Sequence, residues 1–96
     1  MGTRKRPQPK RLAEKLLQVR KLLGLSQEQL AEKLKDVPSS PQAAHISRFE
    51  AGAREPSLLY LLEMARLSGI TLDVLVDDEM DLPQRLPGRQ KVKRDK

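Results

Sequence analysis

Residues 25–52 read LSQEQLAEKLKDVPSSPQAAHISRFEAG, and this stretch decides the fold. Its first part predicts a short helix, because Ser26 and Gln29 have the three-residue spacing of an N-terminal capping box. The apolar positions that follow recur at helical spacing and would face a core: Leu30, Ala31 and Leu34. Pro38 and the two serines after it then prevent this helix from continuing.

A second helix is expected in the same stretch, from about residue 41 to residue 51. Two starts fit the sequence. Ser40 can be the N-cap with Pro41 at the first helical position, where proline is favoured. Alternatively, Ser39 can be the N-cap, with Gln42 three residues later as a second capping box. The first start is the preferred interpretation, and the glycine that follows ends the helix in either case.

The two faces of this second helix differ in character. A helical wheel places one group of side chains toward the core: Ala43, Ile46, Phe49 and Glu50. It places another group on the opposite side: Pro41, Ala44, His45 and Arg48. This outward stripe is small near its start and polar further along. Such a stripe suits a helix that enters a groove closely and reads it with a few side chains.

Three further helices are expected around this pair. The periodic apolar positions predict helices at about residues 10–23, 57–68 and 71–76. The second of these would begin at Ser57 or at the proline before it, and its leucines, including Leu58 and Leu59, would supply its buried face. Val, Ile, Phe and Tyr are few, so a β-sandwich or barrel lacks its usual residues. The sequence therefore predicts one all-α domain of five helices over residues 10–80.

The formal net charge of +6 comes from the two ends of the chain. Residues 1–11 carry a net +5 and residues 85–96 another +5, whereas residues 12–84 hold eight basic and twelve acidic side chains. Residues 1–9 are predicted to be a flexible basic arm, either a solvated tail or an arm that embraces DNA. Residues 81–96 are predicted to be a basic disordered tail. A polyanionic partner would be attracted mainly by these ends.

Composition also limits the chemistry. The chain has no cysteine, which excludes disulfides and thiolate metal sites. It has one histidine, so the ligands of a zinc ion would have to be almost all carboxylates, which zinc rarely accepts. It has no glycine-rich phosphate loop, no nucleophile elbow and no second histidine to activate a serine. No enzyme activity, cofactor or metal is therefore expected. The sequence has neither a membrane span nor a signal peptide, so a cytoplasmic protein is expected, associated with the nucleoid when bound to DNA.

The order and spacing of several short motifs resemble the helix-turn-helix family of phage repressors and Cro, also called the xenobiotic-response-element type. The matching residues are Arg20, Gly24 to Gln27, Leu30 to Leu34, Ile46 to Gly52, Arg54, Pro56 to Leu58, and Gly69 to Leu75. Each piece alone is weak, but their order and spacing together are specific. The matches cover most of residues 12–76.

This resemblance implies a five-helix fold in which the third helix lies in the DNA major groove and the second lies across the backbone. Carried over to this sequence, the base-reading positions fall on Ala43, Ala44, His45 and Arg48. Gln27 and Arg54 would contact phosphate. Arg20 and Glu50 match a pair that in this family forms an internal ion pair between the first and third helices.

The sequence departs from the family pattern between the second and third helices. Eleven residues separate Leu34 from Ile46, more than in most family members, and Lys35 stands where they have a glycine. The longer interval must either bulge the turn or lengthen the third helix at its start. An extra leading residue changes which side chain first meets the groove. This promotes Gln42 over Ala43 as the first base contact.

Arg48 is the leading functional candidate, because it stands in the middle of the outward face and arginine to guanine is the commonest specific base contact. His45 could donate to phosphate or base, or it could simply be a solvent-exposed histidine. Gln42 could pair with adenine or only cap the helix. The arm adds three basic candidates for DNA contact: Arg4, Lys5 and Arg6.

These features predict a sequence-specific regulator of transcription, a repressor that acts as a homodimer on palindromic double-stranded DNA. The dimer surface is expected around three apolar residues of the last helix: Leu72, Val74 and Val76. The alternative is an antitoxin or adaptor whose helical body mainly binds a protein, such as a toxin or a co-regulator. RNA binding is disfavoured, because one Phe and one Tyr offer almost no stacking platform.

Overall fold

The computed structural model describes residues 9–86, and these residues form five α-helices and no strand. The helices are α1 (Leu12–Leu23), α2 (Gln27–Lys33), α3 (Ala43–Glu50), α4 (Leu58–Ser68) and α5 (Leu72–Val76). The all-α prediction is therefore confirmed, with the five helices in the expected order. No helix in this described part is long and apolar enough to cross a membrane.

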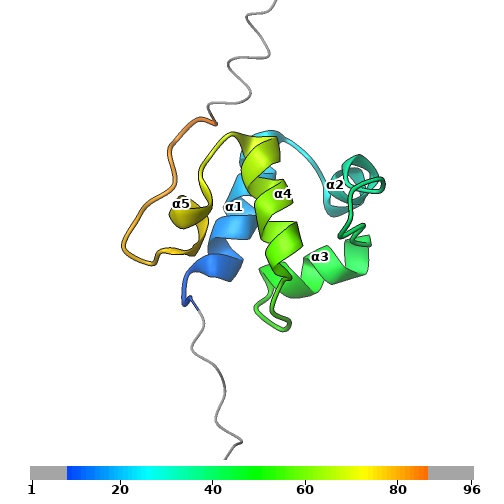
Figure 1. Cartoon of the computed structure of the whole chain (residues 1–96), viewed down its shortest axis with the longest axis horizontal. Helices are drawn as coiled ribbons and strands as arrows, with labels where there is room; N and C mark the ends of the chain where they lie inside the picture. Colours follow the sequence, from blue (N-terminus) through cyan, green and yellow to red (C-terminus); the bar gives the residue numbers. More distant parts are fainter. Residues whose placement is uncertain (1–8, 87–96) are drawn as a thin grey trace, which may run out of the picture.

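The helices pack as one body around α1 and α4 (Figure 1). α5 lies on one side of these two helices, and α2 and α3 lie on the other. α1 contacts α3, α4 and α5, while α2 packs on α3. α1 therefore lies at the centre of the fold, and α2 and α3 form a pair on the side of α1 opposite to α5.

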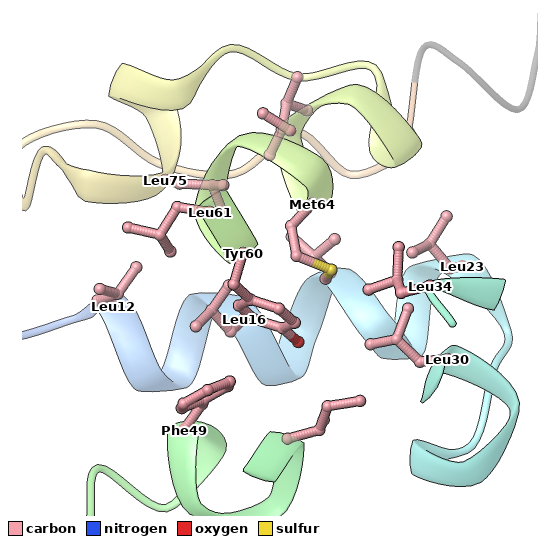
Figure 2. Close-up of a cluster of buried hydrophobic side chains, with 14 of the residues drawn as sticks. Leu12, Leu16, Leu23, Leu30, Leu34, Phe49, Tyr60, Leu61, Met64 and Leu75 are labelled. Atoms are coloured by element: carbon pink, nitrogen blue, oxygen red, sulfur yellow. The ribbon is translucent and has the colours of Figure 1, made fainter. Parts of the chain in front are cut away.

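A single apolar core lies between these helices (Figure 2). Each helix contributes at least one fully buried side chain to it: Leu16, Leu30, Ile46, Met64 and Leu75. Burial of a side chain of this size stabilises a fold by roughly 1.5–3 kcal/mol. Since α3 is anchored in the core through Ile46, the side of α3 that carries this residue is not available to a partner.

An aromatic pair joins α3 to the first turn of α4. The ring centroids of Phe49 and Tyr60 are 4.8 Å apart, with the ring planes tilted by 48°. Tyr60 is almost fully buried, and its hydroxyl ends inside the core cluster (Figure 2). Among residues 9–86 no hydrogen-bond partner for this hydroxyl is found. Burial raises the pKa of Tyr60, so the phenol stays neutral.

Several predicted helix ends agree with the structure. The Ser26 hydroxyl accepts a hydrogen bond from the Gln29 N–H at 3.0 Å, and the Ser26 N–H donates to Gln29 Oε1 at 2.8 Å. This is the predicted capping box. α1 ends at Gly24, whose φ of 76° lies in the left-handed region that favours glycine. Ser57 caps α4, because its hydroxyl accepts from the Tyr60 N–H at 3.1 Å.

The predicted burial of Leu58 and Leu59 is wrong, since these side chains are 71% and 47% exposed. The buried face of α4 begins later, with Tyr60, Leu61 and Met64. Leu58 stands one turn before Leu61, where the helical stripe continues but the core has ended. A periodic pattern indicates which side of a helix is apolar, but not how far along the helix the core extends.

The packed body also continues past the predicted boundary at residue 80. Leu86 is 2% exposed and Leu82 packs against the core, so residues 81–86 do not belong to a disordered tail. Isolated leucines in a basic, proline-containing segment give no periodic signal that could predict their burial. The rest of the predicted tail, residues 87–96, lies outside the described residues, as do residues 1–8 of the predicted arm.

Reciprocal hydrogen bonds join the start of α1 to the end of α5, through Arg11, Lys15 and Asp78, which we call the α1–α5 clasp. The Asp78 carboxylate accepts from two backbone N–H groups that precede α1, each at 2.9 Å. Lys15 is 2% exposed, and its Nζ donates to the carbonyls of Val74 at 2.8 Å and Asp77 at 2.7 Å. The clasp therefore satisfies helix-end groups that would otherwise lack partners.

Asp78→Ala is expected to lower the melting temperature and to weaken its dependence on pH. The backbone N–H groups of Lys10 and Arg11 lower the pKa of Asp78. A carboxylate with a lowered pKa stabilises the folded state above its unfolded pKa of about 4, and it loses this contribution as the pH falls through the folded value. The difference between parent and variant should therefore be largest at neutral pH and shrink in acid.

Thermal unfolding of both proteins from about pH 7 to about pH 2 measures this difference. Asp78→Asn serves as the control, because it keeps an acceptor oxygen without the charge. At neutral pH its melting temperature should lie between those of the parent and Asp78→Ala. A difference in melting temperature that stays constant over this range would contradict the role given to the ionised carboxylate.

Candidate nucleic-acid interface

α3 begins at Ala43 with Gln42 as its N-cap, so both predicted starts, with Ser40 or with Ser39 as the cap, are wrong. The backbone N–H of Gln42 donates to Nδ1 of His45 at 3.2 Å. His45 thus takes the role that a glutamate or glutamine has at the third position of a usual capping box. A histidine three residues after the N-cap is not a recognised sequence signal for the start of a helix, so the sequence did not predict this cap.

The later start of α3 follows from the contacts of the α2–α3 turn, residues 34–42. The N–H of Ser39 donates to Glu63 Oε2 at 3.3 Å, and the Ser39 hydroxyl donates to the other oxygen of this carboxylate. Glu63 is a buried residue of α4. Pro41 is buried too, which corrects its predicted outward position. Because the chain is held against α4 at Ser39 and turned inward at Pro41, α3 can begin only afterwards.

The structure therefore decides how the longer interval is accommodated. The α2–α3 turn bulges, with Ser40 at a φ of 37°, and α3 is not lengthened but has eight residues. The turn also contributes Val37, which packs against the core. The additional residues form an ordered part of the fold.

Four exposed residues form a continuous stripe along α3 at helical spacing: Ala44, Ser47, Arg48 and Ala51. Prediction from the sequence missed Ser47, although its spacing of three from Ala44 and four from Ala51 carries the signal. Small side chains surround one long cation in this stripe. Another surface can therefore approach the backbone of α3 closely while Arg48 extends into it.

The remaining predicted positions of α3 flank this exposed stripe. Gln42 is exposed at the start of the helix. Ala43 and His45 are half-buried, so their side chains are less accessible to a partner than that of Gln42. Gln42 and Arg48 are the exposed long polar side chains among these positions.

Buried hydrogen bonds hold α3 in place relative to α1 and α2. The ion pair expected between Arg20 and Glu50 is present, with Arg20 Nε at 2.7 Å from Oε2 and a second guanidinium nitrogen at 2.9 Å from Oε1. The side chains are only 13% and 4% exposed. Arg20 also donates to the carbonyl of Leu25 at 2.9 Å, and Gln27 Nε2 donates to Glu50 Oε1 at 3.1 Å.

This arrangement, the Arg20–Glu50–Gln27 network, connects α1, the turn after it, the start of α2 and the end of α3. Hydrogen bonding to Glu50 raises the pKa of Arg20, so the guanidinium remains charged. Gln27 was expected only to contact phosphate, but in the structure its side chain also binds Glu50. These internal bonds fix the position of α2 relative to α3 before any partner binds.

Arg54 lies in the loop after α3 and is exposed. It lines a shallow hollow together with His45, Phe49 and Ser57, where α3, the α2–α3 turn and the start of α4 meet. Arg54 is thus beside α3 but outside the exposed stripe. The arm candidates Arg4, Lys5 and Arg6 lie outside the described residues.

A comparison with protein families adds a decisive observation to this geometry. The model of a helix-turn-helix family matches residues 16–75, which contain α2, α3 and α4 in full, most of α1, and α5 up to residue 75. The chain belongs to the helix-turn-helix family. It is of the Cro and phage-repressor type, as the sequence motifs predicted. No curated protein and no solved structure gives a match.

Membership of the helix-turn-helix family identifies α2 and α3 as its characteristic helix pair and makes this protein a DNA-binding regulator of that kind. The matched region also contains the departure noted above, the bulged α2–α3 turn held by Glu63.

Proposed function

We propose that this protein is a transcriptional repressor that binds a palindromic operator as a homodimer and reads the major groove with α3. The exposed stripe of α3 carries this proposal, because three small residues surround Arg48 on an otherwise unobstructed helix face. A major groove admits one α-helix, and close approach requires small side chains beside the reading ones. Promoter occupancy alone would then exclude the polymerase.

The residues around α3 suit different kinds of contact. Arg48 is placed to bind guanine O6 and N7 with its planar guanidinium, and Gln42 can bind adenine at the start of the helix. Ala43, Ala44 and Ser47 let the backbone approach the base edges. Direct readout would thus depend mainly on Arg48 and Gln42.

Phosphate contacts are proposed on either side of this reading face. Gln27 uses one amide hydrogen for Glu50 and would donate the other to a phosphate oxygen. Arg54 would donate from the loop after α3, and the arm residues Arg4, Lys5 and Arg6 would add charge. Because residues 12–84 have more acidic than basic side chains, these local cations would provide the attraction.

A second copy of the chain is expected because one short helix reads only a few base pairs. The sequence suggested Leu72, Val74 and Val76 as its contact surface, but all three are partly buried against the core of their own chain. Leu58 and Leu59 offer more apolar surface, at the start of α4 next to the loop that carries Arg54. A partner copy would cover these two leucines.

Arg48→Ala is expected to relax specificity at one base position of each half-site. Selection from random duplex DNA first identifies the operator, and an inverted repeat among the selected sequences would support the homodimer. Loss of a bidentate arginine contact should then reduce discrimination at that position by about 1–3 kcal/mol. Binding assays on the operator and on its single-base variants, at one stated salt concentration, measure this loss.

Arg54→Ala is the matched control, since it removes the same type of side chain from a phosphate-contacting position. It should weaken binding to all sequences alike and reduce the slope of the salt dependence by about one. If no duplex is enriched, or if Arg48→Ala retains the parent's preference at every position, the proposal is wrong.

A further inference from the structure

The cap of α3 determines the hydrogen-bonding character of His45. The Gln42 N–H lies 3.2 Å from Nδ1 of the ring. A backbone N–H can only donate, so Nδ1 must accept and carries no hydrogen. In the neutral ring the remaining hydrogen is therefore on Nε2. One backbone contact thus makes Nε2 of His45 a donor.

His45 stands where such a donor can meet DNA. It belongs to the first turn of α3, next to Ala44 of the exposed stripe and one helical turn before Arg48. The ring is half-buried, and it lines the hollow that also contains Arg54. It is therefore positioned between the proposed base-reading stripe and a proposed phosphate contact.

We infer that the Gln42 cap restricts His45 to the Nε2–H tautomer and that His45 is a specificity-determining donor to a hydrogen-bond acceptor of the DNA. This inference rests on the proposed function. The acceptor is an oxygen or nitrogen on a base edge or a phosphate oxygen. Of the two ring nitrogens, Nδ1 already accepts the N–H of Gln42, so only Nε2 remains available to bind the nucleic acid.

The restriction has a consequence for recognition. A free histidine can change tautomer and so either donate or accept, whereas His45 in this cap can only donate. It can bind guanine O6 or N7, adenine N7, thymine O4 or a phosphate. It cannot accept from the amino group of cytosine or adenine, and an unpaired donor opposite such a group would cost affinity. The backbone at Gln42 thus contributes to specificity without contacting DNA.

The tautomer can be tested in the free, full-length protein. His45 is the only histidine of the chain, so its ring nitrogens give unambiguous signals in 15N NMR. Gln42→Pro deletes the donor N–H, and its φ of −92° is close to the range that proline requires. Gln42→Ala is the matched control, because it removes the same side chain but keeps the N–H.

At mildly alkaline pH, the parent and Gln42→Ala should show an unprotonated Nδ1 and a scalar coupling across the hydrogen bond between this atom and the residue-42 amide nitrogen. Gln42→Pro should lose this coupling. A protonated Nδ1 in the parent, or the absence of the coupling in both the parent and Gln42→Ala, would overturn the restriction.

The contact itself is tested on the selected operator, with each base pair substituted in turn and each phosphate replaced in turn by methylphosphonate. One such change should weaken binding of the parent by about tenfold and leave binding of His45→Ala unaffected. A base position would identify a base-edge acceptor, and a phosphate position would identify a backbone acceptor.

Equal losses for the parent and His45→Ala at every position would overturn the inference while leaving the proposed function intact. Failure to enrich any duplex would instead refute the proposed function and this contact together. Gln42→Pro and Gln42→Ala provide a check that does not alter His45. Both variants lose the Gln42 side chain and any base contact that it makes, but only Gln42→Pro also loses the N–H that holds His45. Gln42→Pro should therefore weaken preference at the position affected by His45→Ala more than Gln42→Ala does.

Discussion

Glu50→Ala is expected to lower the free energy of unfolding by about 3–5 kcal/mol, the cost typical of removing one partner from a buried ion pair. The Arg20 guanidinium is only 13% exposed and would lose both of its hydrogen bonds to the carboxylate. Gln27 would lose its acceptor as well. Urea unfolding followed by circular dichroism measures the loss.

The matched control for this prediction is the double variant Arg20→Met with Glu50→Leu. It removes both charges and leaves apolar side chains of similar volume, so it should cost much less than Glu50→Ala alone. A loss below about 1 kcal/mol for Glu50→Ala would mean that the pair behaves like an exposed ion pair, contrary to its burial.

Lys15→Ala is expected to lower the free energy of unfolding by about 2–4 kcal/mol. The substitution leaves a cavity where the buried aliphatic stem packs, and it leaves the carbonyls of Val74 and Asp77 without their donor. Cations at a helix C-terminus also interact favourably with the helix dipole, and this contribution at α5 would be lost. Urea unfolding again provides the measurement.

Lys15→Met separates the two causes, because it keeps most of the stem but has no donor. Its cost should be about half that of Lys15→Ala, and the remainder reports the packing of the stem. If Lys15→Met were as stable as the parent, the ammonium group would not contribute to the α1–α5 clasp.

The parts of the fold that could be predicted from the sequence are those set by residues close together in the chain. The capping box of Ser26 and Gln29 and the stop at Gly24 depend on a few neighbouring residues, and both appear as expected. The Arg20–Glu50 pair is distant in sequence, but the family resemblance implied it. Local signals and one recognisable family pattern therefore carried most of the prediction.

The predictions that failed depend on contacts that no local pattern records. The start of α3 depends on Glu63, which is far along the chain. Its carboxylate binds Ser39, one of the two residues expected to cap the helix, so Ser39 does not act as a cap. Lys15, for which no prediction was made, occupies a core-facing position because α5 offers its ammonium group two carbonyls. Leu86 is buried although its surroundings in the sequence resemble a disordered tail.

The same reasoning applies to the proposed site. Helical spacing predicted the positions of Ala44 and Arg48 on the outer face, and it would also have predicted Ser47 had the stripe been followed along the whole helix. The role of His45 in capping could not be predicted, because it depends on where α3 begins. That start depends in turn on the contacts of the turn before it.

The bond between Ser39 and Glu63 has a practical consequence for protein engineering. Recognition helices are attractive units to exchange between relatives, but here the segment before α3 is joined to α4 by a buried carboxylate. A transplanted helix with a shorter connection would leave Glu63 without its partner. New operator preferences are therefore better sought by changing only the exposed side chains of α3, with the native turn kept whole.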